Sequence, residues 1–330
     1  ADQADAISAA ETALETAEGH FVDLQAAEKL VFVDVSPDTI AKVVSDRTGV
    51  PLGKMMRDQA AAALSMQDTL MQHIKGQDHA MHQISEVLKS SRSGLRDPDQ
   101  PLGIFLLVGP SGTGKTETAL SVADIMFGGE QSLISINMSE FQEKHTVSRL
   151  VGSPPGYVGY GEGGVLTEAV RQRPYSVVLL DEVEKAHLDV VNLFYQVFDK
   201  GVLSDGEGRE INFRNTVVFL TSNLALDVIT ELCHGDEIPS AETITAAIRP
   251  ILSNHFKPAL LARMTIVPYL TLPQAVLRDI VNIKLKKVAD RMLRTNKITL
   301  NVSTAAAEAI AARCTEVETG ARNIDFILRG

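Results

Sequence analysis

The most informative stretch of this sequence is Gly109-Pro110-Ser111-Gly112-Thr113-Gly114-Lys115-Thr116. It follows the apolar run 103–108 and precedes a segment of helical composition, 117–126. Gly-x-x-x-x-Gly-Lys-Thr between a strand and a helix is the pattern of a phosphate-binding loop. Its glycines let backbone N–H groups point inward, and the following helix presents its positive dipole end to a phosphate. We therefore predict that these residues hold a nucleoside triphosphate.

Two carboxylates predict the second half of this site, because an apolar strand-like run ends in Asp181 and Glu182. Lys115 is placed to reach the β- and γ-phosphates, and the Thr116 hydroxyl is a ligand type suited to Mg²⁺. Asp181 would orient Mg²⁺ through water, and Glu182 would polarise the attacking water. Asn223 ends another apolar run, where it would bond to the γ-phosphate or the lytic water; a plain strand-end turn residue is the alternative.

Apolar strand-like runs alternate with helical segments along the chain. We expect strands at 103–108, 133–137, 176–180 and 216–221, and helices at 37–47, 58–73, 78–91, 165–172, 189–200, 274–294 and 304–313. Near-continuous apolar strands separated by helices predict an α/β fold, a parallel sheet flanked by helices on both faces. Phosphate binding is expected at the carboxyl end of the first strand of such a sheet.

Three parts of the chain are expected from these patterns. Residues 1–57 would form an N-terminal helical segment and linker, with a strand-like run at 30–35. Residues 58–268 would form a large nucleotide-binding domain. Residues 269–330 would form a small, mostly helical C-terminal lid domain that includes a strand-like segment, Ile298-Thr299-Leu300.

The composition bounds the class of protein. With 330 residues, 45% hydrophobic and 22% charged, the chain is an ordinary globular sequence long enough for two domains. Its net charge of -11 disfavours nucleic acid as a partner, because phosphate neutralisation needs clustered lysine and arginine. Cys233 and Cys314 lack metal-binding spacing, which favours a reducing compartment and no zinc site. Without a long apolar run or a signal peptide, we predict a cytoplasmic protein with no membrane partner.

A glycine- and proline-rich segment, 152–164, cannot form regular structure, yet it carries Tyr157, Val158 and Tyr160. A flexible loop that holds out aromatic and apolar side chains predicts contact with a partner chain. The alternative is that its rings fold back into the core, as aromatic side chains usually do.

Several motifs together resemble the second ATPase module of the Clp/ClpB class of AAA+ unfoldases. They are the phosphate loop, Pro-Pro-Gly-Tyr-Val-Gly-Tyr at 154–160, Leu-Leu-Asp-Glu-Val-Glu-Lys-Ala-His at 179–187 and Phe-Arg-Asn-Thr-Val-Val-Phe-Leu-Thr-Ser-Asn at 213–223. The resemblance spans about residues 40–330 and implies the P-loop AAA+ fold. Phe-Tyr-Gln-Val-Phe-Asp-Lys-Gly at 194–201 and Arg-Cys-Thr-Glu-Val-Glu at 313–318 are similar to the ClpV subgroup of bacterial type VI secretion.

The resemblance implies roles for further residues at the nucleotide. Ile74, Gly76 and Gln77 would contact adenine, although Lys75 replaces the more usual hydrophobic residue there. Asn223 would act as the first sensor of the γ-phosphate.

Two arginines would act in catalysis by the same resemblance. Arg263 aligns with the finger that reaches the γ-phosphate of a neighbouring subunit; a surface salt bridge is its alternative role, and Arg249 is the alternative finger. Arg322 matches the second sensor on the lid, with a surface arginine at a helix N-terminus as the alternative. Tyr157, with Val158 beside it, matches the central-pore residue that grips a translocating polypeptide.

The function implied is an ATP-hydrolysing protein remodeller that uses ATP and Mg²⁺ and threads polypeptide through a homo-hexameric pore. Membership of the ClpV subgroup would direct it to contracted type VI secretion sheaths, and a general ClpB-like disaggregase is the alternative. Two interpretations of another class are a P-loop nucleotide switch and a nucleotide-binding assembly scaffold without threading. Because family lid domains continue beyond the position of Gly330, the lid is expected to be incomplete, which leaves hexamer formation by this chain open.

Overall fold

The computed structural model describes residues 2–24, 35, 37–48, 59–93, 97–157, 159–234, 239–313, 324 and 327. The chain divides into two units, residues 1–47 and 48–330. In the first unit, the alanine-rich start forms helix α1 (Asp2–Leu24), and Pro37 opens helix α2 (Pro37–Thr48), as predicted. The strand-like run expected at 30–35 lies, apart from Val35, outside the described residues.

A five-stranded parallel sheet forms the centre of the second unit, in the order β2-β3-β6-β1-β7. Its strands are β1 (Gly103–Val108), β2 (Leu133–Asn137), β3 (Val177–Asp181), β6 (Val217–Ser222) and β7 (Thr265–Pro268). The predicted parallel sheet is thus confirmed. Strand β7 was not predicted, because a run this short gives too little pattern to distinguish it from a loop. A separate antiparallel hairpin consists of β4 (Val202–Ser204) and β5 (Glu210–Asn212).

Helices account for most of the remaining described residues of this unit. Those predicted are α4 (Gln59–His73), α5 (Asp78–Arg92), α6 (Lys115–Phe127), α8 (Val165–Gln172), α9 (Leu188–Lys200), α13 (Gln274–Asn296) and α14 (Thr304–Arg313). Those not predicted are α7 (Val147–Val151), α10 (Leu226–Cys233), α11 (Ala241–His255) and α12 (Pro258–Leu261). No helix in the described part of the chain is long and apolar enough to cross a membrane.

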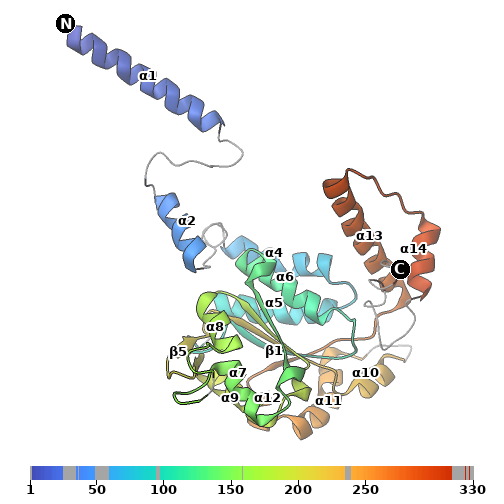
Figure 1. Ribbon diagram of the computed structural model, residues 1–330. Coiled ribbons are helices and arrows are strands. Elements are labelled where there is room, and N and C mark those ends of the chain that lie inside the picture. The colour runs from blue at the N-terminus through green and yellow to red at the C-terminus, as the bar shows by residue number, and fades with distance from the viewer. Residues whose placement is uncertain are drawn as a thin grey trace. The chain divides into compact units, whose positions relative to one another are not determined.

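Alternate residues of the strands face opposite sides of the sheet, and both sides are apolar. Ile104, Leu106 and Val108 of β1 pack in a cluster with side chains of α8 and α9, whereas Phe105 and Leu107 pack with α4, α5 and α6. The alternation follows from the two-residue period of a strand. Two covered faces explain why β1 is an uninterrupted apolar run in the sequence. Figure 1 shows the helix layers on either side of β1.

The C-terminal helices α13 and α14 have an apolar cluster of their own. It joins Leu277 and Val281 of α13 to Ala307 and Ala311 of α14, together with Ile324. A mostly helical C-terminal region is therefore confirmed, and the domain boundaries at 57/58 and 268/269 stay a prediction.

The strand predicted at 298–300 is wrong. Helix α13 ends where Lys297 takes a left-handed conformation with φ 57°, and residues 298–303 form neither helix nor strand. A strand is stable only where a neighbour pairs with its backbone, and none of the strands in the described ranges does so here. Ile298 stays 47% exposed, so its apolar side chain marks a loop and not a sheet.

Candidate active site

The phosphate loop lies between β1 and α6. Gly114, with φ 104°, caps α6, so the first backbone N–H groups of this helix open onto the loop. The N–H of Gly109 donates to the carbonyl oxygen of Ser222 at 3.1 Å, and a Cβ on Gly109 would lie 2.2 Å from the carbonyl oxygen of Tyr269. Only glycine allows this close approach. The start of the loop is therefore held against the ends of β6 and β7.

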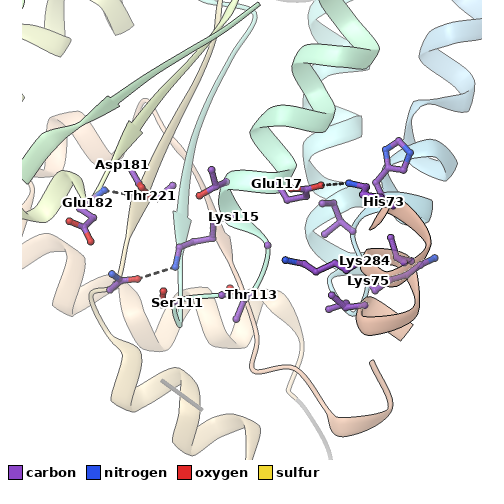
Figure 2. A pocket seen from close by; sticks show the side chains of 18 residues that line it. His73, Lys75, Ser111, Thr113, Lys115, Glu117, Asp181, Glu182, Thr221 and Lys284 are labelled. Carbon is purple, nitrogen blue, oxygen red and sulfur yellow. Dashed lines mark hydrogen bonds and ion pairs between the residues drawn. The ribbon is translucent and has the colours of Figure 1, made fainter. Parts of the chain in front are cut away.

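A cavity of about 280 Å³ lies against this loop. It is lined by His73, Ile74, Lys75, Ser111, Gly112, Thr113, Gly114, Lys115, Thr116, Glu117, Asp181, Glu182, Thr221, Asn223, Ile280, Ile283, Lys284 and Lys287. Figure 2 shows Asp181 and Glu182 on one side, Lys75 and Lys284 on the other, and Lys115 between them. We call the part lined by Lys115, Asp181, Glu182, Thr221 and Asn223 the strand end. The part lined by Ile74, Lys75, Ile280, Ile283, Lys284 and Lys287 is the lid end.

Lys115 links the phosphate loop to the end of β6. The side chain is nearly buried, and Nζ donates to the carbonyl oxygens of Gly109 at 2.5 Å and Pro110 at 2.9 Å. Nζ also donates to Asn223 Oδ1 at 3.1 Å. The structure thus brings together two residues that the sequence predicted separately, at the place where phosphates would lie.

Asp181 and Glu182, at the end of β3, are both fixed by Thr221 of β6. The Thr221 hydroxyl donates to Asp181 Oδ1 and accepts from the backbone N–H of Glu182 at 3.1 Å. Glu182 Oε2 accepts from Lys185 Nζ at 2.8 Å, and this hydrogen bond raises the pKa of Lys185 above its usual value. The strand end therefore presents two carboxylates in defined positions.

The oxygen ligands of the strand end fit Mg²⁺. Thr116 and Asp181 line the same cavity and offer a hydroxyl and a carboxylate oxygen, which are ligand types that Mg²⁺ prefers. The described residues contain no group of three or more His, Cys, Asp or Glu that could hold a metal alone. The ion would therefore complete its coordination with phosphate oxygens and water, as Mg²⁺ usually does with nucleotides.

The lid end is apolar and cationic. Ile74, next to the end of α4, and Ile280 and Ile283 of α13 give it apolar walls. Lys284 and Lys287, also of α13, add positive charge. None of the α13 residues was predicted. The apolar spacing of that helix indicates a buried face, but it does not indicate what this face covers.

Of the three residues predicted at adenine, Ile74 lines the cavity and the other two do not. Gln77 is buried, and its side-chain amide pairs with the backbone of Leu270: Nε2 donates to the carbonyl oxygen at 2.8 Å, and Oε1 accepts from the N–H at 3.1 Å. Gly76 has φ 75°, which favours glycine at this turn. Lys75 lines the cavity beside them. Contact of these residues with adenine stays a prediction.

The predicted arginine finger and the aromatic loop lie outside the cavity wall. Arg263 donates through Nε and Nη2 to Asp199 Oδ1 at 3.0 and 2.8 Å, so the ion pair named as its alternative role is present in this chain. Tyr157 is 70% exposed, which contradicts the alternative that its ring folds into the core. Val158 and Arg322 lie outside the described residues. The roles of all these residues stay predictions.

This geometry defines a class of protein. A parallel α/β sheet with a phosphate loop after one strand, and two carboxylates after another at the same edge, is the architecture of a P-loop nucleotide-binding protein. A family model described as AAA domain (Cdc48 subfamily) matches residues 100–267. A second model, described as the C-terminal, D2-small domain of ClpB protein, matches residues 272–330. The chain belongs to the AAA domain family.

Several named proteins are similar to this chain. The chaperone protein ClpB of Yersinia enterocolitica is 50% identical over 300 residues, 91% of this chain and 34% of that protein. The AAA+ ATPase ClpV1 of Pseudomonas aeruginosa is 50% identical over 306 residues, 92% of this chain and 34% of that protein. A closed-state structure of Hsp104 with ATPγS and FITC casein matches with a TM-score of 0.77 and 36% identity, over 89% of this chain and 51% of that one.

These similarities confirm the resemblance to the Clp/ClpB class. The chain spans about a third of the length of the curated relatives it matches, 34% in both cases given above. The two relatives are equally identical to it, so identity alone does not separate the ClpB from the ClpV interpretation.

Proposed function

We propose that this chain is the ATP-hydrolysing module of a protein remodeller that works as a homo-hexamer and threads polypeptide through its pore. The observation that carries the proposal is the convergence of Lys115, Asn223, Asp181 and Glu182 on one cavity beside the phosphate loop. The similarity to ClpB, ClpV1 and Hsp104 supports the remodelling activity.

In the proposed reaction, water attacks the γ-phosphorus of ATP, the bond to the bridging oxygen of ADP breaks, and phosphate leaves. The loop N–H groups and Lys115 hold the phosphates, and Lys115 exchanges the carbonyl oxygens of Gly109 and Pro110 for phosphate oxygens. Glu182 orients the attacking water and accepts its proton. Asn223, already in contact with Lys115, bonds to the γ-phosphate or to this water.

Mg²⁺, when bound with the nucleotide, neutralises charge on the phosphates. Thr116 would hold it through the hydroxyl and Asp181 through water, and the Thr221 hydroxyl donates to the Asp181 carboxylate. The apolar walls of the lid end, Ile74 and Ile280 among them, accept the base.

Completion of the site between subunits is part of the proposal. Arg263 lies outside the cavity of its own chain, with Asp199 holding its guanidinium, as suits a residue that serves a neighbouring subunit. An arginine supplied in trans makes hydrolysis depend on assembly. Arg322 would read the γ-phosphate from the lid, and the exposed Tyr157, with Val158, would grip the polypeptide.

As substrate we propose the contracted sheath of type VI secretion, on the motifs at 194–201 and 313–318 and the similarity to ClpV1. General disaggregation is a second candidate function, because the similarity to ClpB is as high. We also propose a cytoplasmic location with neither nucleic acid nor membrane as partner, which the net charge of -11 supports for nucleic acid.

The test is ATPase activity per subunit against protein concentration, with Arg263→Ala compared with Arg249→Ala, the variant of the alternative finger. We expect the activity to rise with concentration, Arg263→Ala to lower it by about a thousandfold and Arg249→Ala to leave it unchanged. If the activity per subunit does not change with protein concentration and Arg263→Ala has no effect on it, completion of the site in trans is overturned and the nucleotide switch is favoured. Absent turnover with intact nucleotide binding would favour the scaffold.

A further inference from the structure

Glu182 is held in an unusual backbone conformation. Its φ of 57° and ψ of 47° lie in the left-handed region, which a residue with a Cβ adopts only where surrounding contacts require it. Its backbone N–H donates to Thr221 Oγ1 at 3.1 Å, and its carbonyl oxygen accepts from the N–H of Lys185 at 3.0 Å. The chain therefore turns sharply after β3 and leaves Glu182 in the wall of the cavity.

Lys185 contacts Glu182 a second time, through its side chain. Val183–Lys185 form the short 3₁₀ helix η4, in which residues three apart lie one above the other. Lys185 Nζ consequently meets Glu182 Oε2 at 2.8 Å. One lysine thus fixes both the backbone carbonyl and one carboxylate oxygen of the residue proposed to activate water.

Further carboxylates near this pair also interact with Lys185. Asp181 and Glu184 also attract Lys185, and Glu184 Oε1 accepts from the backbone N–H of Asn223 at 3.2 Å. The hydrogen bond that Lys185 donates to Glu182, together with these attractions, raises the pKa of Lys185 above its usual value. Neutralising Lys185 would remove the ammonium that the Glu182 carboxylate contacts at 2.8 Å.

We propose that Lys185 is a positioning residue for Glu182, whose carboxylate it holds at the angle from which the attacking water is oriented. This inference rests on the proposed function, in which Glu182 accepts the proton of that water. Lys185 is 48% exposed, so its share in folding stability is small. Its effect lies in geometry, because displacing a catalytic group by about 1 Å can cost about a hundredfold in rate.

The experiment compares Lys185→Met and Lys185→Arg with Lys89→Met in steady-state ATPase assays. Lys89 is a matched control, because its Nζ pairs with Glu86 Oε1 at 3.1 Å with the same spacing of three residues, on α5 and outside the cavity wall. We expect Lys185→Met to lower kcat at least about tenfold with KM within about twofold, and Lys185→Arg to recover most of the rate. Lys89→Met should match the unmutated protein, and thermal unfolding should be alike in all variants.

A double variant separates failure of this inference from failure of the proposed function. In a Glu182→Gln background, Lys185→Met should cause no further loss in single-turnover rate, because two residues that act as a unit are not additive. The positioning role would be overturned if Lys185→Met lowered the single-turnover rate as much in the Glu182→Gln background as in the unmutated protein. It would also be overturned if Lys185→Met alone had no effect on kcat, or if Lys185→Arg did not restore the rate. Full turnover in Glu182→Gln, or none in the unmutated protein, would instead overturn the proposed function.

Discussion

The two ends of the nucleotide cavity are built in different ways. The strand end consists of Lys115 at the start of α6 and of residues at the ends of β3 and β6, joined by hydrogen bonds such as Lys115 Nζ to Asn223 Oδ1 at 3.1 Å. The lid end consists of side chains from the end of α4 and from α13, such as Ile74 and Ile283, which meet only because helices pack together. One end is fixed by a shared sheet, and the other depends on how the lid helices lie.

This difference predicts that the two ends of the cavity contribute to different steps of the reaction. Rigid, charged groups suit the transition state, where charge moves between the γ-phosphate and the leaving oxygen. Apolar walls and lysines that contact the base and ribose would act equally in the ground and transition states, so they should affect binding and not the chemical step. Changes at the strand end should therefore lower kcat, and changes at the lid end should raise KM.

The largest effect should come from Lys115→Ala at the strand end. It removes the cation that would neutralise the phosphates, so ATP turnover should fall about a thousandfold or more. Steady-state assays measure the rate, with Lys89→Ala, outside the cavity wall, as control. If ATP turnover fell less than about tenfold, the strand end would not be the part of the cavity that stabilises the charge of the transition state.

An intermediate effect should come from Ile283→Ala at the lid end. Removing apolar area that would cover the base should weaken nucleotide binding about tenfold while leaving kcat at saturating ATP unchanged. Leu293→Ala is the matched control, since Leu293 lies on the same helix, 49% exposed, and outside the cavity wall. Isothermal titration and kcat measured together check this. A fall in kcat with unchanged affinity would reverse the assignment of the two ends.

The smallest effect should come from Lys287→Ala. Lys287 Nζ of α13 pairs with Glu117 Oε1 of α6 at 3.1 Å, and both partners are largely exposed. Exposed pairs contribute little and are screened by salt, so nucleotide affinity should change less than about threefold and the change should vanish in high salt. Lys286→Ala, one position earlier on the helix, is the control. A loss that persists in high salt would show that the lid end contributes charge directly to binding.

Much of the strand end could be predicted from the sequence, for a physical reason. The phosphate loop is a local backbone structure, so its glycines, Lys115 and Thr116 are adjacent in the chain. Asp181, Glu182 and Asn223 are far apart in sequence, but the carboxyl ends of parallel strands meet at one edge of a sheet, and each follows an apolar run. The contact of Lys185 with Glu182 was not predicted, because a turn of this kind leaves no periodic pattern in the sequence.

The lid end could not be predicted in the same way. The apolar residues of α13 indicate a helix with a buried side, but the same pattern would serve a helix packed anywhere on the protein. Gln77 shows a contact that the sequence did not indicate: its amide pairs with the backbone of Leu270, and its contact with adenine stays a prediction.

What the amino-acid order established is the parallel α/β fold, the phosphate loop and the acidic pair, because each rests on short-range backbone geometry or on the common edge of a sheet. What required the folded molecule is the wall formed by Ile280 and Ile283, the pairing of Arg263 with Asp199 and the hold of Lys185 on Glu182. These contacts come from side chains that are positioned by packing and by the exact path of turns, and neither leaves a repeating signal in the chain.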